Sequence, residues 1–288
     1  MGIKIITDSG CDLPEDLIEK HDITVLPIFV LRGEEEYRDK IDIYPEEVLK
    51  GMEEGTVYKT SQTTPEVFLK EFEKHLENED KIICLPLSKE LSGTYQSAVM
   101  ARKIALEKYP DGEIYVQDIN AVSGGEGLIV LETANMVAEG MEISSVLNGI
   151  KKLTENIEHI FTIGDIKYLY RGGRISKVEN LLGGILSIKP ILNVREGKLE
   201  PLEKVRGKNK AFKAIINIMK KRAKNDSLKN QTIIITHGND SESAKKLKRL
   251  IEDEFEVKKI IISSIGAVIG AHAGPGTLAI FFLKENYK

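Results

Sequence analysis

The sequence predicts an α/β protein of two domains, with a largely parallel sheet and helices in the first domain and a mixed sheet with helices in the second. In the first half, short apolar runs alternate with amphipathic runs, the pattern of parallel strands joined by right-handed helical crossovers. In the second half, two apolar runs flank Arg195-Glu-Gly-Lys198, which predicts an antiparallel hairpin. A chain of 288 residues is long enough for two domains, and we place them at residues 1–155 and 156–288.

The first half begins with a strand over residues 3–8 that ends in a polar turn. A short helix follows, with Asp12 as its expected N-cap and Pro14 in its first turn. The next apolar run, 24–30, contains Pro27 and is therefore expected to be an edge strand. Further along we expect helices starting near residues 44 and 64, strands over 81–87 and 113–118, and helices over 92–106 and 127–138.

The second half contains the predicted hairpin, with strands over 185–194 and 198–205 and Gly197 at its tip. A basic amphipathic helix follows around residues 204–224. The remaining elements are a strand over 232–237, a helix that carries Ala244, Leu247, Leu250 and Ile251, and two last strands over 259–264 and 277–283.

Composition narrows the function classes. A chain with 41% hydrophobic and 30% charged residues is ordinary for a globular protein, and its formal net charge of −4 argues against a general nucleic-acid binder. The two cysteines, Cys11 and Cys84, form neither a disulfide framework nor a metal-ligand spacing. No apolar run is long enough for a membrane span, and no signal peptide precedes the first strand, so we expect a cytoplasmic protein.

The segment Ser92-Gly93-Thr94 is the most informative part of the chain. It lies between a predicted buried strand and a predicted helix, where free backbone N–H groups and the helix dipole favour an anion. Gly93 permits close approach to the backbone, and the two hydroxyls can add donors. The alternative is that Ser92 or Thr94 only caps the helix.

Three other polar segments could contribute to a binding site. Thr60-Ser61-Gln62 precedes the helix expected near Pro65 and could either cap that helix or face a ligand. His272 lies among four glycines in residues 266–276, where it could bind an anion, act as an acid or base, or be structural. Arg171-Gly-Gly-Arg174 could hold a phosphate or simply end a helix.

Taken in order, these segments resemble the DegV family, whose best-understood members are fatty-acid-binding subunits of the bacterial fatty acid kinase. The resemblance covers residues 3–283. It rests on Asp8-Ser9-Gly-Cys-Asp12-Leu13, Thr60-Ser61-Gln62, Leu91-Ser92-Gly93-Thr94-Tyr95-Gln-Ser-Ala98, Tyr168-Leu-Tyr-Arg171-Gly-Gly-Arg174-Ile, Ile188-Lys-Pro-Ile-Leu192 and Gly270-Ala-His272-Ala-Gly274-Pro-Gly276. One departure is that Thr63 and Thr64 separate Thr-Ser-Gln from Pro65, whereas the family often has proline directly after it.

The resemblance implies two α/β domains with a long-chain fatty acid between them. Its carboxylate would be bound by Thr60 or Ser61, by Ser92 with the backbone of Gly93 and Thr94, and by His272. Arg171 and Arg174 would contact a kinase subunit that brings the nucleotide and the metal, so the chain itself would be a lipid-binding subunit of phospholipid metabolism and not an enzyme. We expect no cofactor, resident metal, nucleic acid or membrane span. We expect at most transient contact with a membrane.

Elementary physics is consistent with such a ligand. Uncharged donors can receive a carboxylate without quenching its nucleophilicity, as a group that must later attack a phosphate requires.

Two other functions stay open. One is a self-sufficient enzyme, either a carbonyl-substrate kinase subunit using His272 or a hydrolase using Ser92, although Ser92 lacks a Gly-x-Ser-x-Gly elbow. The other is a nucleic-acid binder using the basic helix. The sequence does not define the acyl chain length or unsaturation, the oligomeric state or the kinase.

Overall fold

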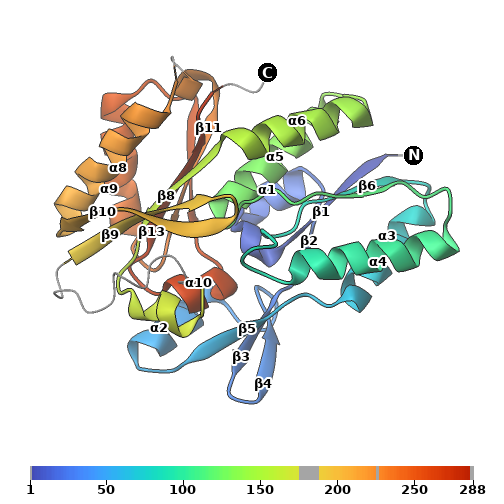
Figure 1. The fold of residues 1–288 in the computed structure, drawn as a ribbon, viewed down its shortest axis with the longest axis horizontal. Helices are drawn as coiled ribbons and strands as arrows, with labels where there is room; N and C mark the ends of the chain where they lie inside the picture. Colours follow the sequence, from blue (N-terminus) through green and yellow to red (C-terminus); the bar gives the residue numbers. More distant parts are fainter. Residues whose placement is uncertain (1, 175–187, 225–226, 286–288) are drawn as a thin grey trace.

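The first sheet is fully parallel, in the order β2-β1-β6-β7. The computed structural model describes residues 2–174, 188–224 and 227–285. Helices α3 and α4 lie side by side next to this sheet (Figure 1). The strands are β1 (Ile3–Asp8), β2 (Ile23–Leu26), β6 (Lys81–Cys84) and β7 (Ile114–Val116), and the helices of this part are α1 (Glu15–Lys20), α3 (Pro65–Leu76), α4 (Thr94–Lys108), α5 (Gly124–Ala138) and α6 (Ile143–Asn156).

The second sheet is mixed, in the order β10-β9-β8-β13-β11-β12, with β11 and β12 parallel and the other neighbours antiparallel. Helices α8 and α9 pack on its outer face (Figure 1). The elements are β8 (Ile157–Thr162), β9 (Ile188–Arg195), β10 (Lys198–Arg206), α8 (Lys208–Arg222), β11 (Thr232–His237), α9 (Ser241–Glu254), β12 (Lys259–Ser264) and β13 (Leu278–Leu283), with short 3-10 turns at Ser9–Cys11 and Ser227–Asn230.

Helix α5 joins the two sheets. It contacts β1 of the first sheet and β8, β11 and β13 of the second, and Figure 1 shows it between them. Nearly all of its residues are buried, as expected for a helix that is apolar on every side. The two sheets therefore share one packed layer, and the predicted α/β architecture with a parallel and a mixed sheet is confirmed. The division at residues 155 and 156 stays a prediction.

A small antiparallel sheet, β4-β3-β5, lies beside the two large ones. Helix α10 comes from the end of the chain but packs against α2, β3 and β5 from its beginning, so Figure 1 shows a red helix among blue and cyan elements. It also contacts α7. This crossing brings distant segments to one place. The elements are β3 (Phe29–Arg32), β4 (Glu35–Arg38), α2 (Pro45–Glu53), β5 (Tyr58–Ser61), α7 (Lys167–Arg171) and α10 (Ala267–Ala273).

Two sequence expectations were wrong, and one helix was not predicted. The run 24–30 is not one strand, because Pro27 separates β2 from β3, which belong to different sheets. Asp12 does not cap α1, whose N-cap is Pro14, because the Asp12 carboxylate is bound to the other end of the chain. The glycine-rich segment 266–276, for which no helix was predicted, contains α10.

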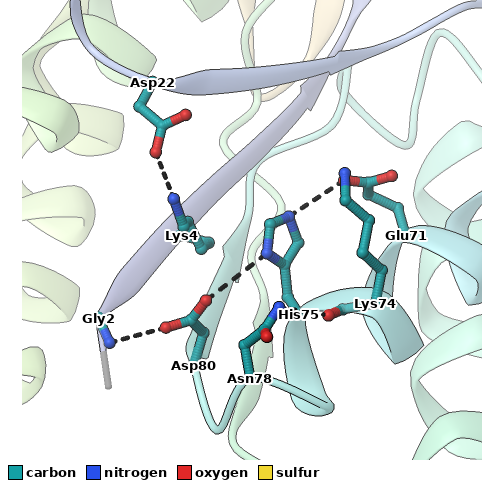
Figure 2. A network of polar contacts seen from close by, with 8 residues as sticks. All are labelled: Gly2, Lys4, Asp22, Glu71, Lys74, His75, Asn78 and Asp80. Carbon is teal, nitrogen blue, oxygen red and sulfur yellow. Dashed lines mark hydrogen bonds and ion pairs between the residues drawn. The ribbon is translucent and has the colours of Figure 1, made fainter.

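A polar network at the amino ends of β1 and β6 includes another histidine, His75. His75 Nε2 lies 3.1 Å from Glu71, and its Nδ1 lies 3.7 Å from Asp80, whose carboxylate also accepts from Gly2 N at 2.8 Å (Figure 2). Lys4 pairs with Asp22 beside it. These contacts fasten the end of α3 to the start of the sheet, away from the carboxyl ends where ligands bind in parallel sheets.

In the described part of the chain, no helix combines the length and the apolar character needed to cross a membrane.

Candidate functional site

A cavity of about 580 Å³ lies where the three sheets meet. Its walls are mostly apolar, and its size is in the range of small-molecule sites. The apolar lining comes from elements on all sides: Ile28, Leu31, Leu87, Leu91, Val122, Phe161, Leu169, Val194, Leu199, Ile265, Val268, Ile269, Ala273, Ala279 and Phe281. The polar lining includes Thr60, Ser61, Gln62, Ser92, Gly93, Arg174 and His272.

The contact between Thr60 and His272 joins the beginning of the chain to its end. Thr60 lies near the end of β5, and His272 lies in the last turn of α10, with Thr60 Oγ1 and His272 Nε2 2.7 Å apart. Burial lowers the pKa of His272 to about 4, and the charge of Arg174 acts in the same direction. The imidazole is therefore neutral near pH 7, with one donor and one acceptor nitrogen.

The other ring nitrogen of His272 lies against a glycine. Nδ1 is buried beside the backbone of Gly172, whose contact with the ring partly offsets the lowering of the His272 pKa. A Cβ at Gly172 would lie only 2.2 Å from Nδ1, so the backbone after α7 can approach the ring only because this residue is glycine. The arginine segment is thereby held next to the histidine.

The Ser92-Gly93-Thr94 turn presents one hydroxyl to the cavity and buries the other. Ser92 Oγ lies 2.9 Å from Thr94 Oγ1 and accepts from Thr94 N at 3.2 Å. Ser92 lines the cavity, whereas Thr94 is fully buried and is not among the lining residues. The N-cap of α4 is Gly93, which has no capping side chain, and Ser92 Oγ instead accepts from the first amide of the helix.

Gln62 is a cavity residue that sequence reasoning did not select. Its Nε2 donates to Ser97 Oγ of α4 at 2.8 Å. A Cβ at Gly93 would lie 1.8 Å from Gln62 Oε1, so Gly93 is needed for the β5 segment and the α4 turn to meet. The Thr-Ser-Gln segment does not cap α3, since Thr64 is the N-cap and makes no side-chain capping bond. Ser61 lines the cavity next to Gln62.

Two buried carboxylates from the first forty residues hold the N-terminus of α10. Asp12 Oδ1 accepts from Gly266 N at 2.7 Å, and Asp39 accepts from Ala267 N at 3.0 Å. Burial raises the pKa of Asp12 to about 7, although the charge of Lys40 opposes the shift, and burial raises the pKa of Asp39 as well. These bonds fix the helix that carries His272. No motif in the sequence indicated this role of Asp39.

The two predicted docking arginines have different surroundings. Arg171 is exposed at the end of α7 and is absent from the cavity lining. Arg174 lines the cavity, and it donates from Nε to Leu91 O at 3.1 Å and from Nη1 to Gly172 O at 2.8 Å. Helix α7 does end at Arg171, as the structural alternative expected. Lys177, which follows in the same run, lies outside the described residues.

The geometry gives little support to a hydrolase centred on Ser92. His272 Nε2 is bonded to Thr60, and Ser92 is bonded to Thr94, so within residues 2–174, 188–224 and 227–285 no base is hydrogen-bonded to Ser92. Nor do the described residues include a group of three His, Cys, Asp or Glu side chains arranged to hold a metal. The site as built can bind an anion through neutral donors beside an apolar cavity.

Comparison with known proteins agrees with the fold. A family model described as an uncharacterised protein of the DegV family matches residues 2–285. A DegV domain-containing protein of Clostridium perfringens is 38% identical over 98% of this chain and 97% of its own length. A solved structure reporting fatty acid binding by a DegV family protein from Thermus thermophilus has a TM-score of 0.90 and 32% identity, covering 98% of this chain and 99% of that one.

A second solved structure is described as a stearic acid-binding protein from Eubacterium ventriosum. It has a TM-score of 0.92 and 29% identity, and the match covers 99% of both chains. The resemblance inferred from the ordered motifs is confirmed by these matches along nearly the whole chain. This chain belongs to the DegV family.

Proposed function

We propose that this protein binds a long-chain fatty acid in the 580 Å³ cavity, with the carboxylate at Thr60, Ser92 and His272. The observation that carries the proposal is the 2.7 Å contact between Thr60 and His272 at the wall of a mainly apolar cavity. The structures from Thermus thermophilus and Eubacterium ventriosum, both described as binding fatty acids, support the same ligand class.

The driving force is the burial of the acyl chain. About fifteen methylenes at about 0.8 kcal/mol each supply roughly 12 kcal/mol before association costs are subtracted. The carboxylate loses its hydration at the same time, which is costly unless several donors receive it. The apolar walls therefore supply the affinity, and the hydroxyl-bearing segments fix the position of the carboxylate.

The hydrogen bonds assign donors to the carboxylate. When His272 Nε2 carries the proton, it donates to Thr60 Oγ1, and the Thr60 hydroxyl is then free to donate to the ligand. Ser92 Oγ accepts from Thr94 N, so its own hydroxyl can also turn towards the ligand. Ser61 and the backbone of Gly93 and Thr94 lie in the same two segments and are the further candidate donors, although Thr94 N must then exchange its bond to Ser92 for one to the ligand. Neutral donors leave the carboxylate negative and nucleophilic.

We further propose that a partner kinase phosphorylates the bound carboxylate. The partner would bring the nucleotide and the metal, and the exposed Arg171 would contact it, with Arg174 behind it at the cavity wall. In this division of labour the chain presents the acid and does not catalyse phosphoryl transfer alone. Because the reaction consumes a nucleoside triphosphate, we expect it to take place in the cytoplasm.

Native mass spectrometry of the protein purified from bacteria tests the ligand. We expect a bound acid of roughly 14 to 18 carbons, as the resemblance to fatty-acid-binding members of the family implies, with each buried methylene contributing about 0.8 kcal/mol. The double variant T60V/S92A should lose most of it, whereas Ser144→Ala on the exposed side of α6 should keep it. Equal occupancy in all three proteins would remove Thr60 and Ser92 from the site, and absence of any lipid from the wild type after reloading would reject the function.

A further inference from the structure

A second pocket, of about 320 Å³, adjoins the fatty-acid cavity. The two share Leu91, Ser92, Gly93, Arg174 and Leu199, so the second pocket meets the first at the proposed carboxylate site. Its other lining residues are Lys89, Glu90, Gly173 and Lys198. The first cavity is mainly apolar, whereas this one is lined mainly by charged and polar groups.

The pocket is assembled from three distant segments. Ser88 Oγ donates to Gly197 O at 3.3 Å, which fixes the tip of the β9–β10 hairpin against the loop after β6. Lys198, next to that tip, is thereby placed beside Glu90, with Nζ 2.8 Å from Oε2. Arg174 reaches the same loop through its bond to Leu91 O. Lys198 and Arg174 therefore lie beside the same loop because these contacts hold their segments against it.

The charges in the pocket are unbalanced in favour of an anion. Lys89, Arg174 and Lys198 line it together with one acid, Glu90. Lys89 pairs with Asp118 at 3.1 Å, and Lys198 pairs with Glu90. Among the described residues no carboxylate lies within ion-pair distance of Arg174, and none of them accepts from its Nη2. The planar, forked N–H groups of a guanidinium favour phosphate oxygens.

We propose that this second pocket receives the phosphoryl group of an acyl phosphate, an inference that rests on the proposed function. A carboxylate oxygen of the bound fatty acid attacks the terminal phosphorus of a nucleoside triphosphate held by the partner kinase. The new O–P bond forms as the P–O bond to the nucleoside diphosphate breaks, and the diphosphate leaves with that electron pair. The acyl carbon stays at Ser92, and the phosphoryl group enters the adjoining pocket.

The internal ion pair gives this pocket selectivity for the product. A free fatty acid ends at the shared wall and leaves Lys198 paired with Glu90. An acyl phosphate adds a doubly charged group that competes with Glu90 for Lys198 and also binds Arg174 and Lys89. The pocket therefore discriminates between the acid before phosphorylation and the mixed anhydride after it.

The test compares two ligands with one acyl chain: palmitate and its hydrolysis-resistant acyl phosphonate, in which a methylene replaces the bridging oxygen. Affinities for delipidated full-length protein are measured by displacement of a fluorescent fatty acid. The variant K89Q/K198Q should weaken phosphonate binding about tenfold or more and change palmitate binding less than about twofold. Glu90→Gln should strengthen phosphonate binding, and Lys103→Gln on the exposed face of α4, outside both pockets, should change neither.

The outcomes separate the two proposals. If wild-type protein does not bind palmitate, the proposed function fails. If it binds palmitate but K89Q/K198Q leaves phosphonate affinity unchanged, or weakens both ligands equally, only the phosphoryl pocket is overturned. Inorganic phosphate forms a third arm, and if it binds as tightly as the phosphonate the pocket is a general anion site, which also overturns the inference.

Discussion

The carboxylate of Asp39 binds one end of helix α10, and His272 lies at the other end of that helix. The Asp39 carboxylate accepts from Ala267 N at the start of α10, and His272 lies in its last turn, where it contacts Thr60. A residue of the first forty thus sets the position of a residue near the end of the chain. The binding site depends on this long-range bond as much as on the residues that face the ligand.

Replacing Asp39 with asparagine should therefore weaken fatty-acid binding without altering any residue that lines the cavity. Asparagine keeps one acceptor oxygen but loses the second, which serves Val268 N at 3.4 Å. We expect a loss of about 1–3 kcal/mol in unfolding free energy and a several-fold weaker affinity. Denaturant unfolding and fluorescent fatty-acid titration measure the two effects.

The matched control is Asp42→Asn, three residues from Asp39, which removes an exposed carboxylate paired with Arg38. Exposed ion pairs contribute little to stability, so this variant should resemble the wild type in both measurements. If Asp39→Asn binds fatty acid as tightly as Asp42→Asn does, Asp39 does not position His272.

Gly93→Ala should disturb the site by steric conflict. The new methyl group would lie 1.8 Å from Gln62 Oε1 and force Gln62 away from Ser97. We expect a destabilisation of about 1–3 kcal/mol and a loss of fatty-acid affinity. The double variant G93A/Q62A should recover much of this loss relative to G93A, because shortening residue 62 makes room. Additive effects in this double-mutant cycle would contradict the proposed contact.

Ligand binding should raise the pKa of His272. Burial lowers that pKa to about 4 in the unliganded protein, below its ordinary value of 6.5. A carboxylate placed beside the ring favours the imidazolium, so binding raises the value and takes up protons in mildly acidic solution. Nitrogen-15 spectra of the histidine ring, titrated with and without palmitate and assigned with His272→Gln, measure the shift. An unchanged pKa would mean that the carboxylate binds elsewhere.

The buried carboxylate of Asp12 should make stability depend on pH. Burial raises its pKa from 3.8 to about 7 in the folded protein, so the proton is bound more tightly in the folded state. Its contribution to stability is therefore full below about pH 4 and is lost as the pH rises through about 7. Asparagine can still accept from Gly266 N and donate towards Ser123, but it does not titrate.

The difference in unfolding free energy between wild type and Asp12→Asn, measured in denaturant from about pH 5 to about pH 8, isolates this effect because other titrating groups cancel. We expect the wild type to lose stability relative to the variant as the pH rises. Parallel curves for the two proteins would show that Asp12 titrates at a normal pH in the folded state.

Much of the fold could be predicted from local patterns. The alternation of apolar and amphipathic runs predicted the parallel sheet, and Gly197 marked the hairpin that is now seen between β9 and β10. The polar segments at Thr60 and Ser92 follow or end strands, and such ends tend to meet. The selection of Thr60, Ser92 and His272 as one site came from the resemblance to the DegV family, which has the same segments in the same order.

The features that local sequence did not predict share a physical cause. Each depends on contacts between residues that are far apart in the chain. No helix was predicted over the glycine-rich residues 266–276, but two carboxylates from the other end of the chain satisfy the first amides of α10. Gln62 was overlooked because its importance comes from a close approach to Gly93, which local sequence does not encode. The second pocket likewise depends on where the hairpin tip contacts Ser88.

A crystal structure of the delipidated protein soaked with palmitate tests the central claim most directly. We predict one acyl chain inside the cavity, with a carboxylate oxygen within hydrogen-bond distance of Thr60 Oγ1 and of Ser92 Oγ. A chain bound with its head away from Thr60, Ser92 and His272, or a cavity that excludes the acid altogether, would contradict the account.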